Sequence, residues 1–412
     1  MVRSALVAML CCGVLAGQAP SVNQLETEAQ QLLAAKDASG ALAKYQELAK
    51  LVPDSAIYQD KIGFILAATK HADEAIPYFQ RAVEMDSKFA QGYYHLGVAL
   101  WLTNQIDPAV RTLQRAAELA PDVGDYRLRL GVAYSETGHY EEGITELLAA
   151  TKQLPKSIDA WQTLALCYQR LQKFLEARNA YKAALDLDPK NTDLRNSYGY
   201  MLVNTREADA GIAEFRKVLL QDPENVGVQV NIGFAYIQKG EIENAIKQLT
   251  KVTQEHPDHP VAHYDLGLAY KQKDDLTAAV TELSRSLELD PQLTEAHYTL
   301  GITYWQSGDF EKTIGEMRAA IGQKPTFAQA WYMLGTALKQ KGDIDAAVDA
   351  LRKSIELDSM NPGPYNTLAL ILRQRGDAEG AKAAFAKAAE IKQAAEQKQA
   401  ELLRQGPAHD LR

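Results

Sequence analysis

A fixed period of about 34 residues runs through most of this chain and restricts the folds that it can adopt. Proline recurs at this interval or at twice this interval, and Ser87 and Ser359 stand at the two positions that the series omits. The prolines are Pro53, Pro121, Pro155, Pro189, Pro223, Pro257, Pro291 and Pro325. A period of about 20–50 residues is typical of solenoids, in which each repeat packs only against its neighbours.

Two columns of small residues keep the phase of the prolines. The first column holds Gly63, Gly97, Gly131, Ala165, Gly199, Gly233, Gly267, Gly301, Gly335 and Ala369. The second holds Ala75, Ala109, Gly143, Ala177, Gly211, Ala245, Ala279, Thr313, Ala347 and Ala381. Four residues after the second column comes a large residue, such as Leu283, on the same helical face. The pattern predicts two helices per repeat that approach closely at the small residues.

The segment between the two predicted helices carries turn and capping residues. Glycine often stands there, at Gly138, Gly240, Gly308, Gly342 and Gly376. An acidic residue often follows, as at Glu241, Asp275, Asp309, Asp343 and Asp377. Glycine ends helices and carboxylates favour helix N-termini, whereas proline prevents a helix from continuing. Each repeat is therefore predicted to form a helical hairpin, and the proline ends its second helix.

These columns resemble those of the tetratricopeptide repeat family. The repeat at 158–191 carries Trp161, Leu164, Ala165, Tyr168, Ala177, Tyr181 and Pro189. The resemblance implies an all-α fold, a right-handed superhelical solenoid of antiparallel helix hairpins. Eleven tandem repeats are expected over residues 22–395. Gln393 replaces the last proline, so we expect the final helix to run from about Gly380 through Leu403, with 396–412 as a capping extension and tail.

The N-terminus is typical of a signal peptide. Arg3 precedes an apolar run over 5–16, which is shorter than the ~20 residues that a membrane-spanning helix needs. We expect cleavage after Ala16, because cleavage after Ala19 would leave Pro20 next. A retained anchor or a buried first helix is the alternative. After signal removal we expect an exported chain, periplasmic or extracellular, without a transmembrane helix.

Cysteine content is compatible with export. Cys11 and Cys12 lie in the predicted signal, so Cys167 alone remains and no internal disulfide can form. A lone cysteine in an apolar helix usually packs in the core. The formal net charge of −9, with no basic block, argues against nucleic acid as a partner.

No catalytic or cofactor motif accompanies the repeats. The sequence has no P-loop, dinucleotide-binding glycine motif, HExxH or CxxC pair. His256, His259 and His263 form the densest histidine group, and the last two have a spacing that suits a metal. However, no third ligand is evident, and His263 lies in a packing column. We therefore predict no enzyme activity, no cofactor and no metal site, with a metal-dependent enzyme at these histidines as the weakest alternative.

The resemblance implies that the first helices of successive hairpins line a concave groove. Counting from Val22 as position 1, aromatic residues recur at positions 5, 9 and 12, with basic residues near the second Trp. The predicted groove residues are Phe64, Tyr94, Trp101, Tyr200, Phe234, Tyr264, Lys271, Tyr298, Trp305, Tyr332, Lys339 and Arg373. Aromatic and arginine-rich patches favour protein recognition. The alternative is family-typical packing for Tyr264, Tyr298 and Tyr332, with the basic residues as a solvated rim.

Position 6 is mostly polar, and it helps to separate functions within the family. It holds His95, Thr163, Ser197, Asn231, Asp265 and Thr299. Family members that clamp a chaperone carboxylate use Lys at position 5 and Asn at position 9, and neither occurs here. We expect an exported scaffold that binds a protein or peptide partner in the groove, in assembly of envelope or secreted structures. The alternative is a substrate-presenting subunit of a separate enzyme such as a glycosyltransferase. An asparagine ladder at position 6 would support that, but only Asn231 fits.

Overall fold

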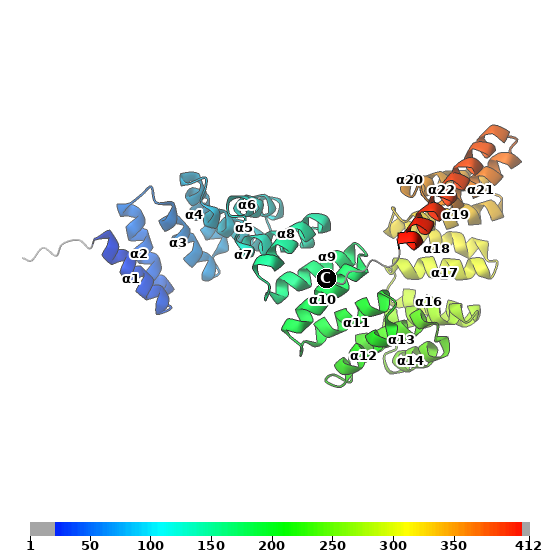
Figure 1. Ribbon diagram of the computed structural model, residues 1–412, viewed down its shortest axis with the longest axis horizontal. Coiled ribbons are helices and arrows are strands. Elements are labelled where there is room, and N and C mark those ends of the chain that lie inside the picture. Colours follow the sequence, from blue (N-terminus) through cyan, green and yellow to red (C-terminus); the bar gives the residue numbers. More distant parts are fainter. Residues whose placement is uncertain (1–20, 406–412) are drawn as a thin grey trace, which may run out of the picture. The chain divides into compact units, whose positions relative to one another are not determined.

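The computed structural model describes residues 21–405, and within them the chain forms 22 α-helices and no strand (Figure 1). The predicted signal peptide, including Cys11 and Cys12, lies outside the described residues, as does the end of the predicted tail. Consecutive helices pack in pairs as antiparallel hairpins. The expected all-α solenoid of helix hairpins is therefore confirmed.

The chain divides into two compact units between Leu194 and Arg195, inside α11 (Thr192–Asn204). The N-terminal unit begins with α1 (Val22–Ala34), α2 (Ala38–Leu51), α3 (Ala56–Ala68), α4 (Ala72–Met85) and α5 (Ala90–Leu102). It continues with α6 (Ile106–Leu119), α7 (Gly124–Glu136), α8 (Tyr140–Gln153), α9 (Ile158–Arg170) and α10 (Phe174–Leu187). Each odd-numbered helix is the first helix of a hairpin.

The C-terminal unit contains the rest of α11 and the following helices. These are α12 (Ala208–Leu219), α13 (Val226–Lys239), α14 (Ile242–Glu255), α15 (Pro260–Gln272), α16 (Leu276–Leu289) and α17 (Thr294–Gln306). They are followed by α18 (Phe310–Gln323), α19 (Ala328–Lys341), α20 (Ile344–Leu357), α21 (Pro362–Gln374) and α22 (Ala378–Gln405). The helix α22 passes through Gln393 without a break, because no proline stops it there.

The glycine column marks where the two helices of a hairpin touch. A Cβ atom placed on Gly267 of α15 would lie 2.7 Å from Cγ and 3.1 Å from the backbone nitrogen of Leu283 in α16. The same contact between a glycine and a large residue of the second helix pairs Gly63 with Phe79, Gly97 with Leu113, Gly131 with Leu147, Gly199 with Phe215, Gly233 with Leu249, Gly301 with Met317 and Gly335 with Leu351. The large residue fills the space that a side chain on the first helix would occupy.

The turn between the helices is left-handed whether or not it contains glycine. The five predicted glycines all have positive φ, for example 80° at Gly138. At the same position of other hairpins, Lys36, Lys70, Asn104, Gln172, Arg206 and Asp274 also have positive φ. A positive φ is unfavourable for residues that carry a side chain. Because six such residues nevertheless adopt it, the hairpin imposes this conformation and glycine is not required at the turn.

The acidic residues cap the second helix of the hairpin at most of the predicted positions. The side chains of Asp275, Asp309, Asp343 and Asp377 each accept a hydrogen bond from a backbone N–H in the first turn of the second helix, which confirms their predicted role. Glu241 makes no such capping bond.

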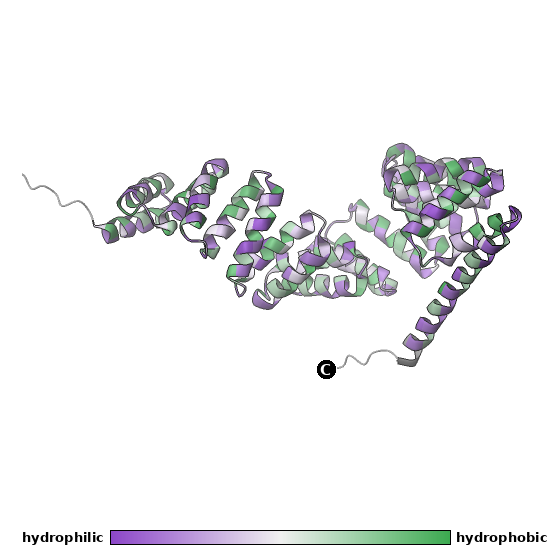
Figure 2. Ribbon diagram, turned by 90° about the horizontal axis from the view of Figure 1, so that it is seen from above, coloured by the Kyte–Doolittle hydropathy of each residue, from purple (hydrophilic) through white to green (hydrophobic). Residues whose placement is uncertain are grey.

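The buried core is a series of small clusters shared by neighbouring hairpins. One such cluster is built around Met317, Leu334 and Leu351 of the C-terminal unit. Figure 2 shows that hydrophobic and hydrophilic residues interleave along the helices. Between residues 21 and 405, no helix combines the length and the apolar character needed to cross a membrane.

We expect Gly267→Ala to destabilise the array by about 1–3 kcal/mol, because the added methyl group would overlap Leu283 and its backbone. Gly315→Ala is the matched control. Gly315 lies within α18, and a Cβ there would have no neighbour within 4 Å. That change should stabilise the chain by roughly 0.5–1 kcal/mol through helix propensity. Urea denaturation measures both, and equal effects would contradict the close-contact explanation.

Candidate partner-binding surfaces

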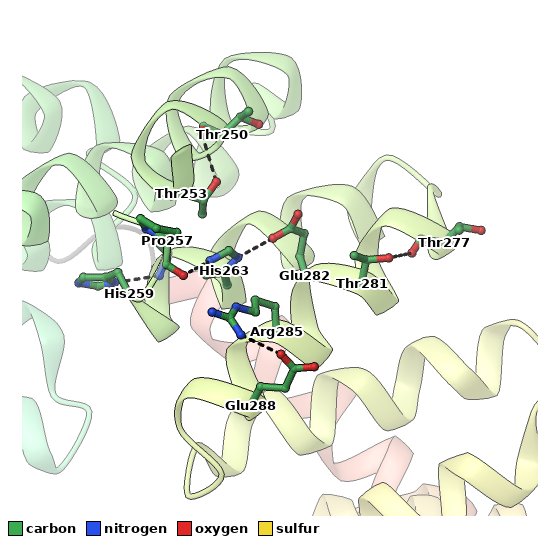
Figure 3. A network of polar contacts seen from close by, with 11 residues as sticks. Thr250, Thr253, Pro257, His259, His263, Thr277, Thr281, Glu282, Arg285 and Glu288 are labelled. Carbon is green, nitrogen blue, oxygen red and sulfur yellow. Dashed lines mark hydrogen bonds and ion pairs between the residues drawn. The ribbon is translucent and has the colours of Figure 1, made fainter. Parts of the chain in front are cut away.

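His259 and His263, two of the three histidines considered as a metal site, form hydrogen bonds within and between hairpins. His263 Nδ1 lies 2.6 Å from Glu282 Oε2, and its Nε2 lies 3.2 Å from the carbonyl oxygen of Pro257 (Figure 3). His259 Nδ1 accepts a hydrogen bond from the backbone N–H of Ala262 and so caps α15. Within the described residues, no group of three or more His, Cys, Asp or Glu side chains is arranged to hold a metal ion.

The contact between position 4 and the preceding proline carbonyl recurs along the chain. His297 makes it to Pro291, and its Nδ1 lies 2.6 Å from Glu316 Oε2. The hydrogen bond that His297 donates to Glu316 raises the pKa of His297, because the carboxylate favours the imidazolium. Other side chains donate to the equivalent carbonyl: Arg127 to Pro121, Trp161 to Pro155, Gln229 to Pro223 and Trp331 to Pro325. Position 4 therefore joins adjacent hairpins.

In the N-terminal unit, the predicted residues Phe64 of α3 and Tyr94 of α5 line an apolar pocket of about 240 Å³. Phe64 is 45% exposed and Leu102, also in the lining, is 66% exposed. Trp101 does not line this pocket; it packs against buried residues of α4 to α7. Large apolar side chains exposed around a pocket are a feature of binding surfaces.

A largely buried hydrogen bond holds one residue of the pocket in place. His95, which lines the pocket, has its Nδ1 2.7 Å from Oδ1 of Asp60, and the Asp60 side chain is only 1% exposed. The ring of His95 also lies 5.2 Å from that of Phe64 and 5.6 Å from that of Phe79. The pocket thus has apolar walls and one oriented imidazole.

In the C-terminal unit, two predicted groove tyrosines, Tyr200 and Tyr264, lie within the electrostatic influence of a buried carboxylate, and Phe234 stacks on one of them. Tyr200 of α11 and Phe234 of α13 stack with ring centroids 5.6 Å apart. In α15, Tyr264 places its hydroxyl 3.5 Å from that of Thr299, and its neighbour Asp265 is 5% exposed. We refer to Tyr200, Phe234, Tyr264 and Asp265 as the aromatic–acidic site.

Burial raises the pKa of Asp265 from 3.8 to about 7, since the low-polarity surroundings disfavour the carboxylate. Burial also raises the pKa of the Tyr200 and Tyr264 hydroxyls, and the negative charge of Asp265 adds to both shifts. Asp265 is therefore close enough to both phenols for its charge to influence them.

The other predicted tyrosines contact the next hairpin. Tyr298 packs with its ring centroid 4.9 Å from that of Phe327, whereas Trp305 packs 5.0 Å from Phe310 in the second helix of its own hairpin. The ring of Tyr332 lies against Gly363. These contacts give the rings a packing role and leave them half-buried. A ligand-binding role for the Tyr264, Tyr298 and Tyr332 row stays a prediction.

The three predicted basic residues differ in their surroundings. Lys271 and Lys339 are half-buried in the last turns of their helices. Arg373 is exposed, and its guanidinium lies 5.9 Å from the ring centroid of Phe385 in the second helix of its own hairpin. The structure does not gather these side chains into one basic cluster with direct contacts.

Sequence reasoning overlooked the pairing of positions 5 and 6 in adjacent repeats. Asp60 with His95, Asn196 with Asn231 and Tyr264 with Thr299 all interact across 35 residues. A search for complementary polar residues at this separation would have found the first two pairs. It would also have shown that Val230, at position 5 of the preceding repeat, offers Asp265 no polar partner.

Replacing Asp265 should change how stability depends on pH. Because the pKa of Asp265 is raised to about 7 in the folded state, the folded chain binds more protons than the unfolded chain between about pH 4 and pH 7. Its contribution to stability is therefore complete below pH 4 and is lost as pH rises through 7. We expect Asp265→Asn to remove this loss, making the variant more stable than the wild type at pH 8 by up to about 4 kcal/mol.

Urea denaturation from pH 4 to pH 8 measures this difference. Asp258→Asn, which removes an exposed carboxylate from a turn, should keep the wild-type pH profile. An Asp265→Asn variant whose stability falls with pH as steeply as that of the wild type would contradict the assignment.

Sequence models cover most of the repeats. A model described as "TPR repeat" matches residues 233–274 and 269–308. Models described as "Tetratricopeptide repeat" match residues 27–88 and 298–362, 158–191, 66–127, and 363–394. No curated protein sequence matches the chain significantly.

Several solved structures match parts of the chain. A crystal structure of MamA is 31% identical, with a TM-score of 0.36, and the match covers 39% of this chain and 94% of that chain. A human IFIT1 dimer with PPP-AAAA is 14% identical, with a TM-score of 0.46, over 82% of this chain and 91% of that chain. A structure of Naa15/Naa10 bound to HypK-THB is 16% identical, with a TM-score of 0.44, and the match covers 90% of this chain and 63% of that chain. These likenesses add nothing beyond the repeated hairpin fold.

Proposed function

Since this chain belongs to the tetratricopeptide repeat family, we propose that it is an exported scaffold that binds a protein partner along the first helices of its hairpins. Binding, and not catalysis, is its activity in this proposal. The partner belongs to an assembly of the cell envelope or of secreted structures.

The observation that carries the proposal is the exposed apolar pocket of the N-terminal unit. Phe64 and Leu102 remain exposed although each lies on a first helix beside other apolar side chains. The pocket is large enough for one bulky side chain of a partner, and His95 offers a hydrogen-bonding group within it. Interfaces commonly combine such an apolar anchor with a polar contact.

Affinity capture from an envelope extract tests the pocket. We expect Phe64→Ser in the chain from Gly17 onward to weaken capture of the partner by at least about tenfold, because a hot-spot contact contributes more than about 1.4 kcal/mol. Leu175→Ser is the matched control, since Leu175 is 53% exposed but lies on α10, a second helix. Circular dichroism checks that both variants remain helical.

If Phe64→Ser and Leu175→Ser captured the same proteins as the wild type, with equal yield, the pocket would not be the binding surface. The double change Tyr298→Ala with Trp305→Ala is less suitable as a test. Both side chains pack against the core cluster of the C-terminal unit, so their loss would alter stability as well as binding.

Export is supported by the apolar N-terminal segment and by the small residues after it. We expect the mature chain to begin at Gly17. Mass spectrometry of the protein from the periplasm or the medium measures its N-terminus. Recovery of the chain from the cytoplasm with residues 1–16 attached would contradict export.

A substrate-presenting subunit of a separate enzyme is the second candidate function. Asn231, at position 6 of α13, donates to the side chain of Asn196, so it serves the contact between adjacent repeats. This bond therefore gives no support to the idea that Asn231 belongs to an asparagine ladder that binds a substrate. Capture of a glycosyltransferase whose activity depends on this chain would favour the alternative.

A further inference from the structure

Two carboxylates are deeply buried among the described residues, and their surroundings differ. Asp60 is 1% exposed and pairs with His95 at 2.7 Å. Asp265 is 5% exposed, and within residues 21–405 no side chain or backbone group forms a hydrogen bond or an ion pair with its carboxylate. A buried carboxylate without a partner costs folding free energy. No contact within the described residues offsets this cost for Asp265.

Two tyrosines, Tyr200 and Tyr264, feel the charge of Asp265, and a third ring, Phe234, stacks on Tyr200. The rings of Tyr200 and Phe234 stack at 5.6 Å, and the Tyr200 and Tyr264 hydroxyls are close enough to Asp265 for its charge to raise their pKa values in addition to the effect of burial. All three rings are half-buried, so part of each remains accessible. An aromatic face attracts a cation through its quadrupole, and the attraction is stronger where water is excluded.

A second carboxylate adds to the negative potential. Glu295 of α17 is exposed, and its charge adds to the rise in the pKa of Tyr264 that burial causes. In the described part of the chain, Glu295 has no basic partner within ion-pair distance. The aromatic–acidic site thus combines a buried carboxylate, three partly accessible aromatic rings and a nearby exposed carboxylate.

We propose that the aromatic–acidic site binds the ammonium or guanidinium group of a lysine or arginine side chain on the partner protein. This inference rests on the proposed function, because it names the chemistry of one contact that the partner makes. The ligand cation would pair with Asp265 and lie against Phe234 and Tyr200. It would supply the positive charge that no residue between 21 and 405 supplies.

The position of Asp265 in the repeat supports a binding role over a structural one. The same position in two other repeats holds His95 and Asn231, and both are bonded to position 5 of the preceding repeat. Val230 stands at position 5 before Asp265, so the usual contact between repeats is missing there. A buried charged residue that lowers stability and forms no internal hydrogen bond or ion pair is typical of a functional site.

The first experiment uses butylammonium chloride as a probe of the lysine side chain, with 1-pentanol as a neutral probe of similar size. Both are titrated into the chain from Gly17 onward at pH 8, and the tyrosine and phenylalanine ring resonances are followed by NMR. We expect butylammonium to cause saturable shifts at Tyr200, Phe234 and Tyr264, and pentanol to cause none. Equal shifts with both probes, or no saturation, would overturn the proposal.

Variants assign the cation to Asp265. Asp265→Asn keeps the shape of the side chain and should abolish the butylammonium shifts, whereas Asp258→Asn should leave them unchanged. Phe234→Leu removes an aromatic face and should weaken binding roughly fivefold. This second variant tests the site independently if Asp265→Asn fails to fold. Wild-type affinity in both Asp265→Asn and Phe234→Leu would overturn the proposal.

Capture of the partner separates this inference from the proposed function. Loss of capture in Asp265→Asn, with capture retained in Asp258→Asn, supports both. If Phe64→Ser loses the partner and Asp265→Asn retains it, the scaffold function stands and the cation contact is wrong. If butylammonium binds through Asp265 but no protein is captured by any form of the chain, the proposed function is wrong, and the assignment of the cation to a partner protein fails with it.

Discussion

The contact between a glycine on the first helix and a large residue on the second determines how closely each hairpin can pack. At Gly267 the side chain of Leu283 occupies the volume that a methyl group would need. Because this distance sets the orientation of the two helices, it also sets which residues of the first helix reach the next hairpin. The contacts at positions 4, 5 and 6 depend on that orientation, and so does the placement of both candidate surfaces.

The hairpins could be predicted from the sequence because their contacts recur at short, fixed separations. The carboxylate caps at Asp275 and Asp309 could be predicted for the same reason. The left-handed turn at Asp274 could not, because local preference disfavours it there and the hairpin as a whole imposes it. The bond between His263 and Pro257 was also missed: position 4 was interpreted as a packing column, although most of its side chains carry N–H donors.

The candidate surfaces were predicted in part. Phe64, Tyr94, Tyr200 and Phe234 were expected on the binding face; in the structure the first two line a pocket and the last two stack on each other. How much of each ring is exposed depends on the next hairpin, which the sequence of one repeat does not reveal. The role proposed for Asp265 was missed because its feature is a missing partner. Only a comparison of positions 5 and 6 across adjacent repeats shows that Val230 stands where a polar partner would be needed.

The bonds that join one hairpin to the next also limit how the length of such a chain can change. Each links a residue to a group that lies a set number of positions away, as between Asp60 and His95 across 35 residues. Inserting a single residue between them would displace one partner and break the bond. Removing a complete repeat would leave the remaining partners in register. Gains and losses of whole repeats are therefore the changes in length that this architecture tolerates best, and a lineage of such proteins would be expected to vary in length by complete hairpins.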